Sequence, residues 1–326
     1  MHPAPHRSNE RTTKNATGPS RRATNTPGPS RRAALGTGAG LLTAGFLASA
    51  TTSASAAAQA PTAGDPYEAL SRLEHTHRAR VGAFAHNTAT GATVAYRAHT
   101  RVPFCSVFKP LAVAAVLRDL DRNGETLARR VHYTDADLVE NSPVTEKHVA
   151  TGMTIAELCA AAVRRSDNTA GNLLLRELGG PTAVTAFARS LGDRTTRLDR
   201  WETELNSAEP WRRTDTTSPA AIGRTYARLL VGDALSPSDR GLLTAWMKTN
   251  ETNTERFRAA LGKDWAIADK TGSGSYGTGN DVGVAWTPDG TPIVLAVLTG
   301  KPEQAAAYDN PLIVDVTKVL ARAVAG

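Results

Sequence analysis

The sequence is poor in the residues that build disulfide frameworks and metal centres. Only two of its 326 residues are cysteines, Cys105 and Cys159, and two cysteines cannot form a disulfide scaffold. The eight histidines include no His-Glu-x-x-His motif, which argues against a zinc-dependent hydrolase. We therefore expect no metal and no cofactor.

The chain also lacks a charge excess outside its first 56 residues. Its net charge of +7 comes from 38 basic and 31 acidic residues. Residues 1–56 hold seven of the basic residues and one acidic residue, which leaves 31 and 30 for the rest of the chain. A nearly neutral body offers no basic surface to nucleic acid, so we expect no nucleic-acid partner.

The basic first segment predicts an export signal. Ser30, Arg31 and Arg32 precede an uncharged stretch over 33–50, and small residues that suit signal cleavage follow. The paired arginines indicate twin-arginine export. The alternative is a membrane anchor, but the stretch is only marginally long enough and too rich in Gly, Ala and Thr. We expect residues 1–56 to be cleaved and the protein to be a secreted monomer without stable membrane association.

Strand signals lie at both ends of the remaining chain, and helical signals lie between them. A Thr-Gly turn between residues 81–86 and 93–96 predicts a β-hairpin. Capping boxes and first-turn prolines indicate helices from about 106 to 250. Near the end of the chain the sequence predicts three strands and a final helix, at 265–268, 282–286, 293–298 and 311–324.

This order predicts an α/β (α+β) fold. We expect an antiparallel sheet of about five strands built from both chain ends, flanked by helices, with an inserted all-helical lobe. Residues 57–326 would form this domain, with 62–100 and 255–326 in the α/β lobe and 101–254 in the helical lobe. The active site would lie between the two lobes.

Two serine motifs fall in the helical region. Ser106 and Lys109 are three residues apart, so a helix places both on one face, and a serine needs such a nearby base to become a nucleophile. One Ser-x-x-Lys is also expected by chance in a chain of this length. Ser166-Asp167-Asn168 lies between two helical segments, where it can be a helix cap, or a proton relay with an amide that binds substrate.

A third motif and a separate glutamate complete the set. Lys270-Thr271-Gly272, followed by Ser273, suits binding of a substrate carboxylate, although a turn with a solvated lysine is the alternative. Glu202, with Asn206 four residues later, can hold and activate a water molecule that hydrolyses an acyl-enzyme. An isolated glutamate would otherwise be read as a surface acid.

In this order and spacing, the motifs resemble those of the class A serine β-lactamases over residues 62–326. The resemblance implies hydrolysis of the β-lactam amide bond of penicillins or cephalosporins, and so antibiotic resistance. Ser106 would be acylated, Lys109 would be its partner, Ser166 would relay protons, and Glu202 with Asn206 would hold the deacylating water. Whether Lys109 or Glu202 takes the proton of the serine during acylation stays open.

The resemblance assigns further residues to substrate binding and to structure. Asn168 would bind the side-chain amide of the substrate, and the backbone N–H groups of Ser106 and Ser273 would form the oxyanion hole. An ion pair between Arg200 and Asp215 would close the loop that carries Glu202. The remaining substrate-binding residues would meet the β-lactam carboxylate: Lys270, Thr271, Gly272, Ser273 and Arg256.

The chain departs from the family pattern at four positions. Gly279 stands where many relatives have an arginine, and Arg256 would take the role of that arginine. Asn141 stands where an aromatic residue is common. Val113 and Gly274 stand where disulfide partners of the two cysteines would fall, so we expect two free thiols.

Two other activities share the three motifs. A D-Ala-D-Ala peptidase lacks the deacylating glutamate, and a penicillin-binding sensor is acylated without efficient deacylation. Glu202 argues against both.

Overall fold

The computed structural model describes residues 64–325. The expected signal segment, residues 1–56, lies outside this range. Within the range, no helix combines the length and the apolar character needed to cross a membrane.

Five strands form the central sheet, and all neighbouring strands are antiparallel. The spatial order is β2 (Thr93–Tyr96), β1 (Arg80–Asn87), β9 (Pro292–Gly300), β8 (Thr278–Trp286) and β7 (Ala266–Gly274). Two short strand pairs lie outside it, β3 (Val102–Pro103) with β6 (Thr216–Thr217), and β4 (Arg130–Val131) with β5 (Met153–Thr154). The N-terminal hairpin therefore joins the C-terminal strands through β1 and β9, as the sequence predicts.

Helices precede, interrupt and follow these strands. The α-helices described are α1 (Pro66–His77), α2 (Lys109–Ala115), α3 (Glu125–Ala128), α4 (Ile155–Arg164), α5 (Asn168–Glu177), α6 (Thr182–Ser190), α7 (Pro219–Leu230), α8 (Pro237–Lys248), α9 (Phe257–Ala260) and α10 (Asn310–Ala325). Other helical turns are η1 (Cys105–Phe108), η2 (Val116–Leu120), η3 (Asp135–Asp137), η4 (Thr145–Lys147) and η5 (Glu204–Ser207).

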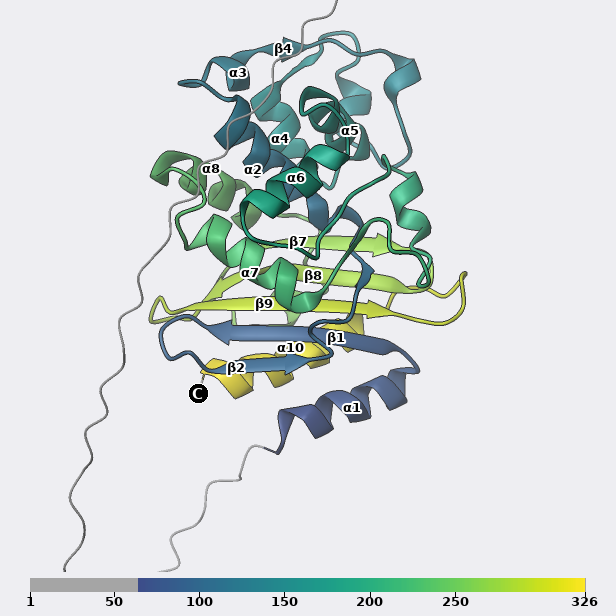
Figure 1. Ribbon diagram of the computed structural model, residues 1–326, viewed down its shortest axis with the longest axis vertical. Helices are drawn as coiled ribbons and strands as arrows, with labels where there is room; N and C mark the ends of the chain where they lie inside the picture. Colours follow the sequence, from purple (N-terminus) through teal and green to yellow (C-terminus); the bar gives the residue numbers. More distant parts are fainter. Residues whose placement is uncertain (1–63, 326) are drawn as a thin grey trace, which may run out of the picture. The chain divides into compact units, whose positions relative to one another are not determined.

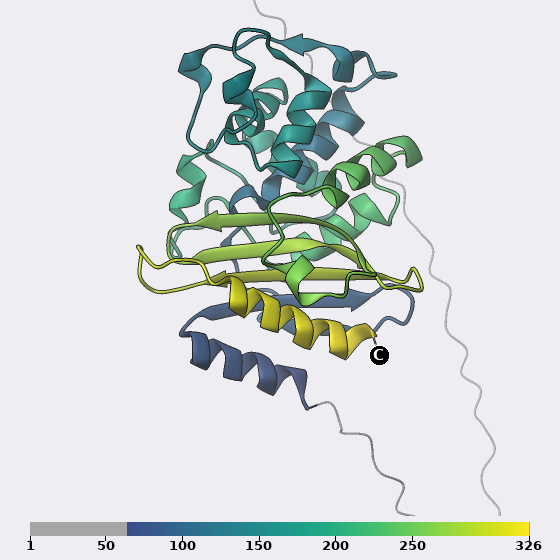
Figure 2. The same cartoon turned by 180° about the vertical axis from the view of Figure 1, so that it is seen from behind.

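Each face of the sheet packs against a different set of helices. On β9, Ile293, Leu295 and Val297 belong to the apolar cluster that includes residues of α1 and α10, and Figure 2 shows α10 in front of the sheet. The alternate residues Val294 and Ala296 face the other cluster, where α7 crosses the strands (Figure 1). A strand buried on both faces needs this uninterrupted apolar sequence, because successive side chains point to opposite sides.

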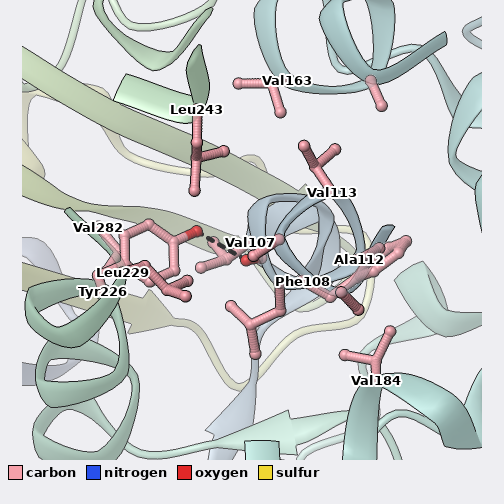
Figure 3. Packing of buried hydrophobic residues seen from close by; sticks show 14 of the residues in the cluster. Val107, Phe108, Ala112, Val113, Val163, Val184, Tyr226, Leu229, Leu243 and Val282 are labelled. Carbon is pink, nitrogen blue, oxygen red and sulfur yellow. Dashed lines mark hydrogen bonds between the residues drawn. The ribbon is translucent and has the colours of Figure 1, made fainter. Parts of the chain in front are cut away.

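The second apolar cluster surrounds α2, the helix that begins at Lys109. Figure 3 shows Ala112 and Val113 of α2 among side chains of the same cluster that come from other elements, which include Val163 of α4, Val184 of α6, Leu243 of α8 and Val282 of β8. In the same view the hydroxyl of Tyr226 on α7 donates a 2.7 Å hydrogen bond to the carbonyl oxygen of Val107. This bond fixes η1, because it occupies a backbone acceptor in the turn that leads into α2.

Helix caps lie where the sequence predicts them. Thr154 and Glu157 form a reciprocal capping box on α4, and the hydroxyl of Ser236 caps α8. The observed sheet, its antiparallel pairing and its flanking helices confirm the expected α+β fold.

Candidate active site

Ser106 lies in η1, and Lys109 is the first residue of α2. Lys109 Nζ is 3.1 Å from Ser106 Oγ, and the side chain of Lys109 is fully buried. Cys105, directly before the serine, has a left-handed backbone with φ 49°. Non-glycine residues adopt this conformation at a cost of about 1–3 kcal/mol, and such costs concentrate at functional sites.

The ammonium group of Lys109 is surrounded by oxygen atoms. Burial lowers the pKa of Lys109, and the carboxylate of Glu202 opposes this by favouring the charged form. The acceptors within 3.4 Å of Nζ are Ser166 O at 2.7 Å, Asn168 Oδ1 at 2.7 Å, Ser106 Oγ at 3.1 Å, Glu202 Oε1 at 3.1 Å and Ser166 Oγ at 3.4 Å. Lys109 therefore joins all three segments that carry the serine, the second motif and the glutamate.

The second motif is both a cap and a part of this site. Asp167 caps α5 by accepting the N–H of Ala170, and it also accepts the N–H groups of Val144 and Thr145. The residues on either side of it, Ser166 and Asn168, both contact Lys109. The cap thus holds two polar side chains toward the buried lysine.

The third motif approaches from the edge strand β7. Lys270 Nζ donates to Ser166 Oγ at 3.0 Å, so the hydroxyl of Ser166 lies between two lysines. Burial, followed by the charge of Lys109, lowers the pKa of Lys270 to about 7. A lysine in this environment changes charge near neutral pH.

Gly272 allows this strand to lie close to the turn that carries Ser106. A Cβ atom at Gly272 would lie 2.8 Å from the carbonyl oxygen of Phe104 and 3.3 Å from Cys105 Cβ. The first distance is too short for any side chain, and the obstructing atom belongs to the backbone. The glycine of the motif is therefore required by packing between β7 and η1.

Arg256 reaches the same strand from the segment before α9. Its guanidinium donates to Ser273 Oγ at 2.8 Å and to the carbonyl oxygen of Gly272 at 3.0 Å, and it lies 5.1 Å from the ring centroid of Tyr308. A Cβ atom at Gly279 would also point toward Tyr308. Arg256 therefore occupies the side of the strand that a side chain at Gly279 would approach.

Glu202 is held by amides on both sides. Its Oε2 accepts from Asn206 Nδ2 at 2.6 Å, and its Oε1 lies 3.3 Å from Ser106 Oγ. Asn172 of α5 accepts the backbone N–H of Glu202 at 2.9 Å and donates to its carbonyl oxygen at 2.8 Å. None of the sequence motifs indicated Asn172, although it follows Asn168 by four residues on one helix face, and that spacing is a usable signal.

The loop that carries Glu202 is closed by the expected ion pair. Arg200 Nε lies 2.5 Å from Asp215 Oδ2, and Asp215 is only 1% exposed. Asp215 also accepts the backbone N–H groups of Asp199 and Arg200. Glu209, which no sequence motif indicates, adds a second carboxylate 3.3 Å from Arg200.

Both cysteines are free and buried, as expected from the sequence. Burial raises the pKa of each thiol, which keeps it uncharged and unreactive. Within residues 64–325 no group of three or more His, Cys, Asp or Glu side chains could hold a metal ion.

The geometry unites the residues singled out in the sequence. A serine hydroxyl faces a buried lysine and a glutamate, and two lysines flank a second hydroxyl. Such an arrangement can form an acyl-enzyme and can supply a second base to hydrolyse it. The fold and the site therefore define a serine hydrolase of the acyl-enzyme class.

Comparisons with known proteins identify the family. The model of the β-lactamase enzyme family matches residues 65–324, and the chain belongs to this family. It is 63% identical to a β-lactamase of Streptomyces fradiae over 78% of this chain and 84% of that protein. It is 57% identical to a β-lactamase of Streptomyces cellulosae over 88% of this chain and 95% of that protein.

A solved structure supports the same assignment. The β-lactamase from Streptomyces albus G matches with a TM-score of 0.79 and 58% sequence identity, over 80% of this chain and 99% of that one. The family and fold expected from the sequence motifs are confirmed.

Proposed function

We propose that this protein hydrolyses the β-lactam amide bond through an acyl-enzyme on Ser106. The observation that carries the proposal is the position of Ser106 Oγ, 3.1 Å from Lys109 Nζ and 3.3 Å from Glu202 Oε1. Membership of the β-lactamase family supports the hydrolysis of β-lactams and the resistance that follows from it. No observation favours a peptidase or a sensor.

In acylation, Ser106 Oγ attacks the β-lactam carbonyl carbon and loses its proton. Lys109 and Glu202 both lie within reach of that proton, and either can be the base. The C–N bond of the ring then breaks, and the ring nitrogen takes up a proton. Ser166 can deliver it, because its hydroxyl accepts hydrogen bonds from Lys109 and Lys270 and so leaves its own proton free to donate. Lys109, which also lies beside Ser106, can return a proton to Ser166 Oγ.

The substrate carboxylate would meet the cationic end of β7. Lys270 supplies an ammonium group, Thr271 and Ser273 supply hydroxyl groups, and Arg256 orients Ser273 through a 2.8 Å hydrogen bond. Charged donors bind a carboxylate more strongly than neutral ones. Asn168 would contact the substrate's side-chain amide, and the N–H groups of Ser106 and Ser273 would stabilise the oxyanion.

In deacylation, Glu202 and Asn206 would hold a water molecule and Glu202 would take its proton. The resulting hydroxide attacks the ester carbonyl, and the ester bond to Ser106 breaks as the serine regains its proton. The amide of Asn206 already donates to Glu202 Oε2, which leaves its carbonyl Oδ1 as a buried acceptor without a hydrogen-bond partner among residues 64–325. A water molecule is the donor that such an acceptor needs.

The test is turnover of a chromogenic cephalosporin by the purified protein. We expect continuous turnover, no turnover by Ser106→Ala, and an added acyl mass on the Ser106 peptide when the reaction is quenched early. A single stoichiometric burst without turnover would instead identify a penicillin-binding sensor or a peptidase.

We also propose that residues 1–56 are a cleaved twin-arginine signal and that the secreted enzyme is a monomer with α/β and helical lobes. The support is the Arg31-Arg32 pair before the uncharged stretch over 33–50. Replacing both arginines with lysine should abolish export and leave intracellular activity unchanged. Export of that variant would contradict the route, and light scattering of the secreted enzyme tests the monomer.

A further inference from the structure

Two aspartates with no role in the proposed mechanism lie fully buried beneath the substrate strand. Asp269 precedes Lys270 on β7, and Asp281 lies on β8. In the strand register Asp269 is opposite Gly283, and Asp281 is opposite Thr271. The two carboxyl groups are therefore diagonal neighbours on one face of the sheet, where long side chains are within reach of each other.

Gly283 provides the space for this pair. A Cβ atom on Gly283 would lie 2.7 Å from the Cβ of Asp269 and 2.3 Å from the carbonyl oxygen of Ala268. Any side chain at this position would displace Asp269 from its place in the strand.

Each carboxyl group has one oxygen bonded to donors and one oxygen without them. Asp269 Oδ1 accepts from the amides of Asn253 at 2.5 Å and Asn250 at 3.3 Å. Asp281 Oδ2 accepts the backbone N–H of Phe257 at 3.1 Å. The other two oxygens, Asp269 Oδ2 and Asp281 Oδ1, are buried and receive no N–H or hydroxyl donor from the residues described.

For these two oxygens the neighbouring group in the strand register is the other carboxyl group. A hydrogen bond between two carboxyl groups forms only if one of them carries a proton. Burial raises the pKa of both groups, and the neighbouring Asp269 carboxylate raises that of Asp281 further. Asp269 has two amide donors and Asp281 has one backbone donor, so the proton belongs on Asp281 and the charge on Asp269.

We propose that Asp269 and Asp281 share one proton and act as a positioning pair, whose single negative charge keeps Lys270 protonated for the substrate carboxylate. Lys270 is fully buried and faces two other cations, Lys109 and Arg256. The aspartate pair opposes their repulsion. A fully ionised pair would place two unsolvated charges in contact, and a neutral pair would leave Lys270 without its counter-charge.

Other ionisable groups also face the pair. Arg256 and Arg258 favour its ionised form, and the buried phenol of Tyr226 on α7 has its pKa raised by burial and then by both aspartates. The groups that act on the charge of Lys270 are Lys109 on α2, Arg256 before α9, and the two aspartates on β7 and β8.

Two variants separate the charge of the pair from its shape. Asp281→Asn imitates the protonated acid, because its amide can donate to Asp269 and its carbonyl can accept from Phe257. The double variant Asp269→Asn/Asp281→Asn has the same size but no charge. The pKa of Lys270 is read in each by carbon NMR of labelled lysine side chains, with Lys270→Arg to assign the resonance.

We expect one aspartate carboxyl of the unmodified protein to stay protonated from pH 5 to 8, and its resonance to be missing from Asp281→Asn. We expect the pKa of Lys270 to be unchanged in Asp281→Asn, which keeps the negative charge on Asp269. The double variant removes that charge and should lower the pKa of Lys270 by about one unit, because the protein interior screens the charge poorly. KM for a cephalosporin at pH 8 should then rise about tenfold only in the double variant, and the difference should shrink at pH 6.

Two results would overturn the proposal. One is the absence of a protonated aspartate in the unmodified protein, a measurement that needs no variant to fold. The other is the same Lys270 titration in Asp281→Asn and in the double variant. The meaning of the KM change rests on the proposed β-lactamase function, but the NMR results do not. A protein that fails to turn over the cephalosporin would therefore refute that function and leave the aspartate pair to be judged by NMR.

Discussion

Replacing Glu202 with glutamine should separate the two halves of the reaction. The carboxylate lies 3.3 Å from the nucleophile Ser106, 3.1 Å from Lys109 and 2.6 Å from the amide of Asn206. Glutamine has the same size but cannot take a proton from water. We therefore expect deacylation to slow by about 10³-fold, within the range that a positioned general base contributes.

Acylation should be affected less, because the same substitution changes Lys109. The Glu202 carboxylate raises the pKa of Lys109 against the effect of burial. Without that carboxylate the pKa of Lys109 falls further, and more of the lysine becomes the neutral amine that can accept the proton of Ser106. The acyl-enzyme should then form faster than it is hydrolysed and should accumulate.

Stopped-flow measurement with a chromogenic cephalosporin and intact mass spectrometry would detect this accumulation. Glu202→Gln should show a burst of one product per enzyme and a persistent acyl mass. Glu204→Gln is the matched control, because Glu204 is exposed on the same loop two residues away, and it should turn over normally. Turnover of Glu202→Gln at the unmodified rate would refute the role assigned to Glu202.

Three further predictions follow from the same geometry. The pKa of Lys270 is lowered to about 7, so its ammonium group is present below this pH and lost above it. KM for the cephalosporin should therefore rise between pH 6 and pH 8, and a KM that stays constant would contradict the role of Lys270 in binding. Asp215→Asn removes the buried charge that pairs with Arg200. Calorimetry should show a loss of about 2 kcal/mol in unfolding free energy, as for a hydrogen bond to a charged group, whereas an unchanged Tm would count against the ion pair. A Cβ at Gly274 would lie 2.9 Å from Cys105 Sγ and 2.7 Å from the carbonyl oxygen of Asn206, so Gly274→Cys should displace the Asn206 backbone as it forms a disulfide with Cys105. One free thiol should then remain in denaturant instead of the present two, whereas three would show that no bridge had formed.

The strands were predictable from the sequence, but their lengths were not. We expected a strand over 265–268 with the lysine motif after it, whereas β7 extends over Ala266–Gly274 and includes the motif. Glycine and hydroxyl residues resemble a turn in the sequence. Here they stay extended because β8 pairs with them through Thr278, and because Gly272 must lie against η1. Contacts between distant segments thus override the local signal.

The local motifs located the reacting residues, since their spacing alone places Ser106 beside Lys109 and Glu202 beside Asn206. Long-range partners carry no such signal. Tyr226 anchors Val107 across more than a hundred residues, and Asp269 meets Asp281 only through the register of two strands. Neither contact has a spacing that a sequence pattern could reveal.

The charges of the site are arranged as two separate pairs joined by one hydroxyl group. Lys109 has Glu202 as its counter-charge, Lys270 has the Asp269–Asp281 pair, and Ser166 Oγ lies 3.4 Å and 3.0 Å from the two lysines. Loss of Glu202 therefore removes the counter-charge of Lys109 alone, and the ammonium group that remains protonated is that of Lys270. Acylation needs a neutral base beside Ser106 and a cation beside the substrate carboxylate. Because Lys109 loses its counter-charge and Lys270 keeps its own, Glu202→Gln should still become acylated, while the release of the product becomes slow.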